Sequence, residues 1–464
     1  MKRSGPGLFL VVTLCIAAIL AAFSGCMAPA GESPAPVPST RADVPQSSTC
    51  PTLVFTDSEF AFELERTLAA TYAGEADIGE CLATASRIKE GDVESWYTEW
   101  KKTADHFRAA GDESLAAGHT VTAREAYYRA ATYYRTSEFF LHGNTSDPRI
   151  VETWGMSREA FRDALALDTV PYEIVAIPYE NTTLPGYFYK VDDAKKPRPL
   201  LIVQTGFDGC QEELHPYAME GLKRGYNVLT FEGPGQGEII RVRHLPFRAD
   251  WENVITPVVD YAVARPDVDS DRIALWGISL GGYLAPRGAA YEPRISALVA
   301  DAGTYDVGLN LLKGMKKGGG PTANMTEKEL QEWLETDPAA FNNEIRQAMA
   351  RDTGTRWLNE NGMYVFNASS PALFWAKWMD MTLEGSAEKI RCPTLVTAGK
   401  TDHFDPGMVQ AQALYDHLTC DKELMIFSDE YGAGSHCQLG AFAQSFAGKF
   451  DWLDKKMGRS GGFG

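Results

Sequence analysis

The pattern of apolar and polar residues changes near residue 170, and the two sides predict different architectures. Between about residues 55 and 167, apolar side chains recur at steps of three and four, as at Trp96, Trp100 and Ala104, with Gly118 as a break. This spacing places them on one face of a helix. The helix pair resembles one tetratricopeptide unit, but no repeat of fixed period follows it. We therefore predict a helical cap domain at residues 51–170 and not a peptide-binding array.

After Tyr172, short continuous apolar runs alternate with helical segments. This alternation is typical of a mostly parallel sheet with helices on both faces, so residues 171–464 predict an α/β domain. The first two runs, divided at residues 180–184, predict an antiparallel hairpin. The predicted strands are YEIVAIPYE, LPGYFYKV, PLLIVQTGF, YNVLTFEGPG, RIALWGISL, ISALVADAG, TLVTAGKTD and ELMIFSDE, and the intervening helices include residues 213–224, 251–264, 408–418 and 439–455.

One helical excursion interrupts this alternation. Residues 305–390, with EKELQEWLETD and NNEIRQAMARD, separate two predicted strands. Reacting groups of a parallel sheet lie where its strands end. An insertion at that edge would cover them, so we predict a helical lid.

The sequence of the N-terminus predicts a processing segment. Lys2 and Arg3 precede a nearly unbroken apolar run from Leu8 to Phe23, which ends in small residues before Cys26. This resembles the lipobox of prokaryotic lipoproteins, in which cleavage precedes the cysteine and lipid is attached to its thiol. Residues 1–26 are then a signal peptide, and residues 27–50, rich in Pro, Ala and Ser, a flexible tether. We expect an exported, extracytoplasmic cell-envelope lipoprotein on a membrane; a plain secretory signal and an uncleaved anchor remain alternatives.

Composition narrows the range of partners. A formal net charge of -18 argues against nucleic acid, because that binding depends on Lys and Arg neutralising phosphates. The chain has no C-x-x-C pair for a zinc site, and FEGPGQGE lacks the spacing of a nucleotide loop. We expect no metal and no organic cofactor. The oligomeric state stays open, with a dimer as one possibility.

The cysteines fit an oxidising compartment. Without Cys15 and Cys26, an even number remains, and three pairings suggest themselves. Cys50 with Cys81 would join the start of the cap, Cys392 with Cys420 would face one another at the sheet edge, and Cys210 with Cys437 would require two site loops to meet. Free buried thiols are the alternative.

The clearest candidate for chemistry is Ser279, within RIALWGISLGGYLAPRGAA. The strand-like run before it and the helix-like run after it supply the context of a nucleophile elbow, in which a sharp turn exposes the hydroxyl. Gly277 and Gly281 are needed there because side chains would collide with the neighbouring backbone. A chance G-x-S-x-G turn is the alternative.

A serine hydroxyl needs a base, and the base needs an orienting carboxylate. Asp402 follows the run TLVTAGK, and His436 lies on a Gly-rich loop after the next strand, which gives the order Ser, Asp, His. Asp405 is the competing acid, and His403 could be a base but is poorly placed beside Asp402. We predict a triad of Ser279, Asp402 and His436.

The reaction also needs backbone donors for an oxyanion. One should be the amide of Leu280, at a helix N-terminus where unpaired N–H groups favour negative charge. The other should come from the loop TGFDG after PLLIVQ, most simply the amide of Phe207. A plain turn is the alternative for this loop.

Together these motifs resemble the α/β-hydrolases, in the branch typified by 2,6-dihydropseudooxynicotine hydrolase and fungal polyketide-shortening hydrolases. The resemblance rests on AGHTVTAREAYYRAATYY, TGFDGCQEE, FEGPGQGE, GISLGG, GKTDHFDP and GAGSHCQ, and covers about residues 96–457. It implies an α/β-hydrolase fold, the same triad, and a cap that closes over the substrate. Thr205 stands where many relatives have Gly or His.

The resemblance also suggests substrates and pocket residues. Members of the branch hydrolyse esters or a carbon–carbon bond next to a ketone, and some use an extra acid, for which Asp301 or Asp306 could serve. Asp208 and Tyr305 complete the set of candidate pocket residues. We expect a lipid-anchored serine hydrolase acting on a small acyl or ketone substrate. An acyl-peptidase or amidase of the same fold, and a non-catalytic surface-binding lipoprotein, are the alternatives.

Overall fold

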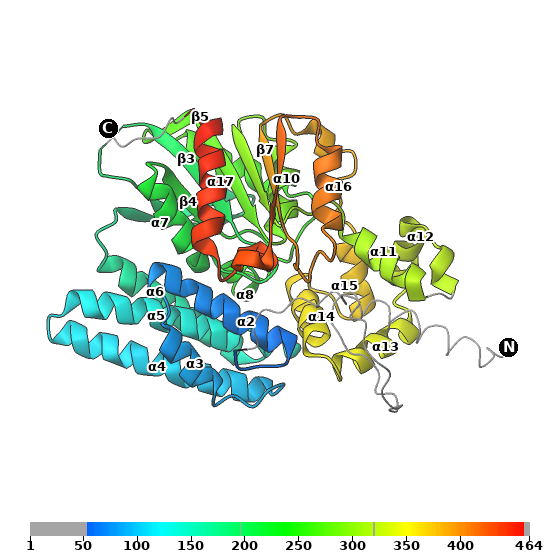
Figure 1. Cartoon of the computed structure of the whole chain (residues 1–464), viewed down its shortest axis with the longest axis horizontal. Coiled ribbons are helices and arrows are strands. Elements are labelled where there is room, and N and C mark those ends of the chain that lie inside the picture. Colours follow the sequence, from blue (N-terminus) through cyan, green and yellow to red (C-terminus); the bar gives the residue numbers. More distant parts are fainter. Residues whose placement is uncertain (1–52, 195, 319–320, 459–464) are drawn as a thin grey trace, which may run out of the picture.

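A computed structural model describes residues 53–194, 196–318 and 321–458 (Figure 1). The predicted signal peptide, the lipidation of Cys26, the tether and Cys50 lie outside these residues. Within them, none of the helices combines the length and the apolar character that a membrane span requires.

An eight-stranded sheet forms the centre of the molecule, in the order β1-β2-β4-β3-β5-β6-β7-β8. The pairs β1–β2 and β2–β4 are antiparallel, and all later neighbours are parallel. The predicted mostly parallel sheet and its opening hairpin are therefore confirmed. The strands are β1 Tyr172–Tyr179, β2 Thr182–Tyr189, β3 Arg198–Gln204, β4 Asn227–Phe231, β5 Val268–Ile278, β6 Ala297–Asp301, β7 Thr394–Gly399 and β8 Lys422–Phe427.

Burial along the strands explains the sequence pattern. Every residue of β4, β6 and β7 is buried, because helices cover both faces of the central sheet. The second half of β1, at one edge of the sheet, alternates between exposed and buried residues. Continuous apolar runs therefore mark the central strands, and alternation marks the edge.

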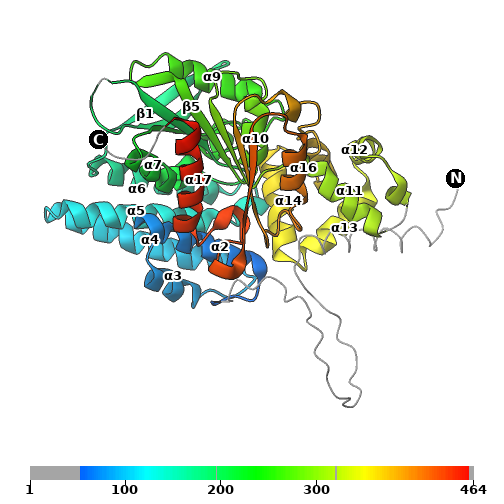
Figure 2. The same cartoon turned by 45° about the horizontal axis from the view of Figure 1, so that its top comes forward.

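Helices pack on both faces of the sheet. In Figure 1, α7 (His215–Lys223) and α17 (Phe442–Lys456) lie in front of it. Behind it lie α9 (Glu252–Val263) and α10 (Gly281–Ala289), which Figure 2 brings into view, while α16 (Val409–His417) packs on β7 and β8. Helices on both faces therefore separate the central strands from solvent, as the α/β pattern predicted.

Two predicted helices begin later than expected. The segment predicted from residue 213 divides into a 3-10 turn, η3 (Gln211–Leu214), and α7, because Pro216 favours the first turn of a new helix. The last helix begins at Phe442 and not at 439, since Cys437, Gln438 and Gly440 all have positive φ angles.

The N-terminal helices form one body against the edge where the parallel strands end (Figure 1). Aspartates cap several of them: Asp57, Asp92 and Asp147 each accept N–H groups of a first turn. Gly111 lets the ring of Tyr127 approach, because a Cβ there would lie 2.4 Å from it. The elements are α2 Ser58–Ala69, η1 Ala70–Ala73, α3 Ile78–Ala85, α4 Val93–Ala116, α5 Thr120–Glu138, η2 Leu141–Gly143 and α6 Pro148–Ala166.

A second helical body, between β6 and β7, lies beside the first (Figure 1). Its helix α14 packs against α2 and η2, so the two helical bodies meet over the same edge of the sheet. Its elements are α11 Val307–Gly318, η4 Pro321–Asn324, α12 Glu327–Glu335, α13 Ala339–Met349, α14 Thr353–Val365, α15 Pro371–Trp378 and η5 Ala387–Lys389.

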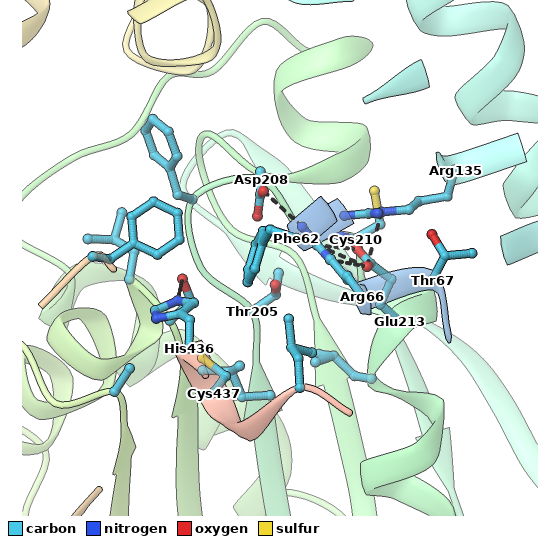
Figure 3. A pocket seen from close by; sticks show the side chains of 18 of the residues that line it. Phe62, Arg66, Thr67, Arg135, Thr205, Asp208, Cys210, Glu213, His436 and Cys437 are labelled. Carbon is cyan, nitrogen blue, oxygen red and sulfur yellow. Dashed lines mark hydrogen bonds and ion pairs between the residues drawn. The ribbon is translucent and has the colours of Figure 1, made fainter. Parts of the chain in front are cut away.

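The cysteine pairings predicted among described residues do not form. Cys81, Cys210, Cys392, Cys420 and Cys437 are free thiols. Cys210 and Cys437 lie apart (Figure 3), because the loops that carry them meet different parts of the site. Cys420 Sγ instead lies 3.6 Å from Oγ1 of Thr394.

Candidate active site

Ser279 lies in a sharp turn between β5 and α10. Its φ angle is +62°, a left-handed conformation that costs a residue other than glycine roughly 1–3 kcal/mol. Glycines make room for the turn: a Cβ at Gly277 would lie 2.0 Å from the carbonyl oxygen of Gly281, and one at Gly282 would lie 2.3 Å from that of Ala302. The packed turn holds the serine hydroxyl at the mouth of a cavity.

Two later loops bring an imidazole and a carboxylate to this hydroxyl. His436 opens a short turn after β8, η7 (His436–Gln438), and its Nε2 lies 2.8 Å from Oγ of Ser279. Its Nδ1 lies 2.7 Å from Oδ2 of Asp402, which follows β7. The other oxygen of Asp402 accepts the amide N–H of Phe404 at 2.8 Å. The structure therefore brings the three predicted side chains into one hydrogen-bonded chain.

The electrostatics of this hydrogen-bonded chain make the imidazole of His436 a stronger base. Burial opposes a charge on His436, but the Asp402 carboxylate outweighs burial and raises the pKa of His436 well above its ordinary value. Burial likewise opposes ionisation of Asp402, and His436 reverses this and lowers the Asp402 pKa. An ionised Asp402 holds the Nδ1–H tautomer, which leaves Nε2 free to act as a base.

The alternative acid and base have other roles. The Asp405 carboxylate accepts the N–H groups of Gln410 and Ala411 at 2.9 and 3.1 Å, so it caps α16. The ring of His403 packs edge-on against Phe62 with centroids 4.7 Å apart, and burial lowers the pKa of His403 to about 4. Neither residue takes part in the chain described above.

The loop after β3, residues 205–209, passes close to the same serine. A Cβ at Gly206 would lie 2.6 Å from the amide nitrogen of Leu280, so only glycine allows this approach. Among the described residues, the amides of Phe207 and Leu280 have no hydrogen-bond acceptor. The hydroxyl oxygen of Thr205 lies so close to Gly209 that a Cβ on Gly209 would be 1.9 Å from it. Two unpaired N–H groups beside a serine can stabilise an oxyanion.

A cavity of about 220 Å³ opens above these groups. Aromatic rings line the part beneath α14 and α15; the rings of Phe207 and Trp378 stack there with centroids 4.9 Å apart. The other part of the lining includes Thr67 on α2, Thr136 on α5 and Ser157 on α6. Each of these hydroxyls donates to a backbone carbonyl, and its oxygen can accept a hydrogen bond. The cavity therefore suits a small molecule that is apolar at one end and can form hydrogen bonds at the other.

A buried ion cluster closes the cap side of the cavity. Arg66 on α2 donates to Oδ2 of Asp208 at 2.9 Å and to both carboxylate oxygens of Glu213 at 3.0 Å (Figure 3). Arg135 on α5 pairs with Glu213 and Glu63. Burial opposes ionisation of Asp208, but Arg66 and then Arg135 lower its pKa. Asp208 lines the cavity as predicted and ties the 205–209 loop to the cap.

The other predicted pocket residues lie outside the lining of this cavity. Asp301 is fully buried at the end of β6, where it pairs with Nζ of Lys449 at 2.5 Å. Tyr305 stacks on His417 with centroids 4.3 Å apart. Asp306 accepts the first N–H groups of α11. Their backbone follows a strand end, but their side chains serve packing, charge pairing and helix capping.

One group of described residues has donor atoms spaced for a metal ion. Atoms of Cys210, Glu212 and Glu232 lie within 4.8 Å of one another. Glu232 accepts the amide of Gln211 at 3.1 Å, and Glu212 accepts the hydroxyl of Tyr187 at 2.8 Å. Burial and then Glu212 raise the pKa of Glu232 to about 8. The proximity of the two carboxyls disfavours ionisation of both, because adjacent like charges repel.

Several contacts of the site were missed by the sequence prediction. Helix α2 places the ring of Phe62 near that of His436, with centroids 6.3 Å apart. It also brings Arg66 into contact with Asp208 of the 205–209 loop. Gln236, within FEGPGQGE, and Asn361 of α14 both donate to carbonyls of that loop. The one available signal was a glutamine between glycines at a strand end.

Comparison with known proteins gives the family. A model described as "Alpha/beta hydrolase family" matches residues 204–436, and one described as "Esterase FrsA-like" matches residues 75–307. The chain is 35% identical to the 20-hydroxy-prefusarin hydrolase FUS2 of Gibberella moniliformis, over 86% of this chain and 97% of that protein. It is also 35% identical to the hydrolase acrC of Aspergillus aculeatus, over 86% of this chain and 96% of that protein.

Solved structures share the fold. The crystal structure of 2,6-dihydroxy-pseudo-oxynicotine hydrolase aligns with a TM-score of 0.66 at 20% identity, covering 84% of this chain and 96% of that one. Wild-type AbyA5 aligns with a TM-score of 0.58 at 17% identity, covering 87% of this chain and 95% of that one. The predicted fold class is thereby confirmed. The chain belongs to the α/β-hydrolase family, and it is a hydrolase.

Proposed function

We propose that this hydrolase cleaves an ester, or a carbon–carbon bond next to a ketone, through a covalent acyl-enzyme on Ser279. The observation that supports this most directly is the chain of hydrogen bonds from Ser279 through His436 to Asp402, at 2.8 and 2.7 Å. It ends at a cavity large enough for a small organic substrate.

The reaction begins with attack on the substrate carbonyl. Oγ of Ser279 forms a bond to the carbonyl carbon while Nε2 of His436 takes the hydroxyl proton, and the carbonyl π electrons move onto oxygen. The amides of Phe207 and Leu280 stabilise this oxyanion. Asp402 holds the imidazolium in place through Nδ1–H.

Collapse of the tetrahedral intermediate breaks the bond to the leaving group and re-forms the carbonyl. His436 returns its proton to the leaving alkoxide of an ester, or to the carbon of the enolate released from a ketone. A water molecule, deprotonated by the same imidazole, then attacks the acyl-enzyme. This step releases the acid and restores Ser279.

The cavity supports a small acyl or ketone substrate. Its aromatic part can take an apolar acyl or alkyl chain, and its hydroxyl-bearing part can hold oxygen substituents. A relative named for 20-hydroxy-prefusarin agrees with a small-molecule substrate. The guanidinium of Arg66 is paired with Asp208 and Glu213, so its charge is not available to an anionic substrate.

The test is a screen of p-nitrophenyl esters of rising acyl length beside a panel of β-diketones, with wild type and Ser279→Ala. We expect hydrolysis of at least one class, lowered by about 10⁴-fold or more in the variant. Release of a methyl ketone together with a carboxylic acid would identify carbon–carbon cleavage. Equal rates for wild type and variant would refute the acyl-enzyme.

We also propose export and lipid anchoring through Cys26, which the apolar run from Leu8 to Phe23 supports. The full chain expressed in a bacterium should sediment with membranes and carry a labelled fatty acid. Cys26→Ser should lose both properties. A soluble, unlabelled wild type would refute the anchor.

A further inference from the structure

Orientation of the 205–209 loop decides whether it can stabilise an oxyanion. In a trans peptide, the carbonyl of one residue and the N–H of the next point in opposite directions. The amide of Phe207 therefore points away from the carbonyl of Gly206. A residue that binds the carbonyl of Gly206 therefore also fixes the direction of the Phe207 N–H.

Gln236 holds it. The Nε2 group of Gln236 donates to the carbonyl oxygens of Thr205 and Gly206 at 2.9 and 3.0 Å. Oε1 of Gln236 accepts the amide of Gly233 at 2.9 Å, which fixes the orientation of the side-chain amide. The side chain is 2% exposed, so water does not compete for these bonds.

The next carbonyl of the loop, that of Phe207, is bound by a side chain of the helical body between β6 and β7. Nδ2 of Asn361, on α14, donates to the carbonyl of Phe207 at 3.3 Å. Oδ1 of Asn361 meets Nδ1 of His142 at 2.8 Å, and Nε2 of His142 meets Glu138 at 2.9 Å. Three successive loop carbonyls thus have side-chain donors, while the Phe207 amide has no acceptor among the described residues.

We propose that Gln236 is the positioning residue of the oxyanion hole: by binding the carbonyls of Thr205 and Gly206, it turns the amide of Phe207 toward Ser279. Asn361 adds a second, weaker hold from α14. The motif FEGPGQGE thereby acts on the reaction without touching the substrate. This inference rests on the proposed acyl-enzyme mechanism.

The test replaces Gln236 by Met, which keeps the length of the side chain and removes both donors. We expect kcat to fall about 10- to 100-fold with KM nearly unchanged, because the loss is felt only when charge develops on oxygen. The affinity of a trifluoromethyl ketone, which forms an oxyanion on the serine, should fall by the same factor. Binding of the carboxylic acid product should not change.

Asn227→Leu is the matched control. Asn227 is also 2% exposed, and its amide binds backbone groups of Val191 and Asp267 at the opposite end of β4. This variant should lower Tm as Gln236→Met does but leave kcat unchanged. Gln236→Glu, which replaces the donor by an acceptor, should lose at least as much kcat as Gln236→Met and provides a second variant if Gln236→Met does not fold.

The outcomes separate the two proposals. A folded Gln236→Met with kcat within about twofold of wild type, or equal losses of kcat in Gln236→Met and Asn227→Leu, would overturn the positioning role. Activity of wild type that does not depend on Ser279 would instead overturn the proposed function itself.

Discussion

At the scale of single residues, the chemistry depends on the protonation of His436. Its pKa is the result of two opposed effects: burial disfavours the charged imidazole, and the Asp402 carboxylate 2.7 Å from Nδ1 favours it more strongly. Only the neutral imidazole can take the Ser279 proton. Activity must therefore appear as the pH rises through the pKa of His436.

The acid limb of kcat/KM should consequently have its midpoint above 6.5, the ordinary value for histidine. Asp402→Asn should lower kcat about 10³- to 10⁴-fold and move the remaining midpoint to lower pH, since the carboxylate that raises the pKa is gone. A pH profile of both proteins measures this. A wild-type midpoint at or below the ordinary value would contradict the account.

At the scale of elements, the junction between the N-terminal helices and the α/β domain depends on one buried carboxylate. Glu138, at the end of α5, accepts hydrogen bonds from Nε and Nη2 of Arg241 on α8 (Gly237–Arg241). It also lies 2.9 Å from Nε2 of His142 in η2. Burial opposes its ionisation, but Arg241 and then His142 lower its pKa to about 2. The N-terminal helical body and the α/β domain are thereby joined at this side chain, and His142 extends the contact to Asn361 of α14.

Glu138→Gln should lower the free energy of unfolding at pH 7 by about 3–5 kcal/mol, because Arg241 would remain buried without a counter-charge. The folded pKa of Glu138 lies below its ordinary value of 4.5, so its contribution is present above about pH 4.5 and is lost as the pH falls toward 2.

Urea unfolding should therefore show a difference between wild type and Glu138→Gln that shrinks from pH 7 to pH 3. Glu113→Gln, at an exposed position of α4, is the control and should change little at either pH. An equally stable Glu138→Gln at pH 7 would contradict this account of the junction.

The positions of the proposed catalytic residues could be predicted from the sequence around each of them. Ser279 could be placed at a turn because a strand, two glycines and a helix flank it, and Asp402 and His436 because each lies in a loop that follows a predicted strand. Gln236, Arg66 and Asn361 could not, because their contacts join segments far apart in the chain. Asp301 shows the opposite error: a strand end indicates where a residue lies, but not that its side chain turns to Lys449.

At the scale of the whole molecule, the cap completes the site. Arg66 on α2 spans from the cap to Asp208 and Glu213, which flank the proposed oxyanion loop. Glu213 also pairs with Arg135, but the largely buried carboxylate of Asp208 has Arg66 as its ion-pair partner. The position of α2 and the position of the 205–209 loop are therefore coupled.

Arg66→Met should lower kcat/KM about tenfold and reduce stability by about 3 kcal/mol, since it leaves the buried carboxylate of Asp208 without its ion-pair partner. Arg108→Met is the control: Arg108 pairs with Asp163 within the cap, and its loss should leave kcat/KM unchanged. Steady-state kinetics and thermal unfolding of both variants provide the comparison. Equal effects on kcat/KM would contradict the coupling of cap and loop.

The central claim, that Ser279 is a nucleophile activated by His436 and Asp402, is tested most directly by mass spectrometry after reaction with a fluorophosphonate. The account predicts one covalent adduct on the peptide that contains Ser279, formed faster as the pH rises through the pKa of His436, and none in Ser279→Ala. A folded wild type that stays unlabelled, or an adduct that persists in Ser279→Ala, would contradict it.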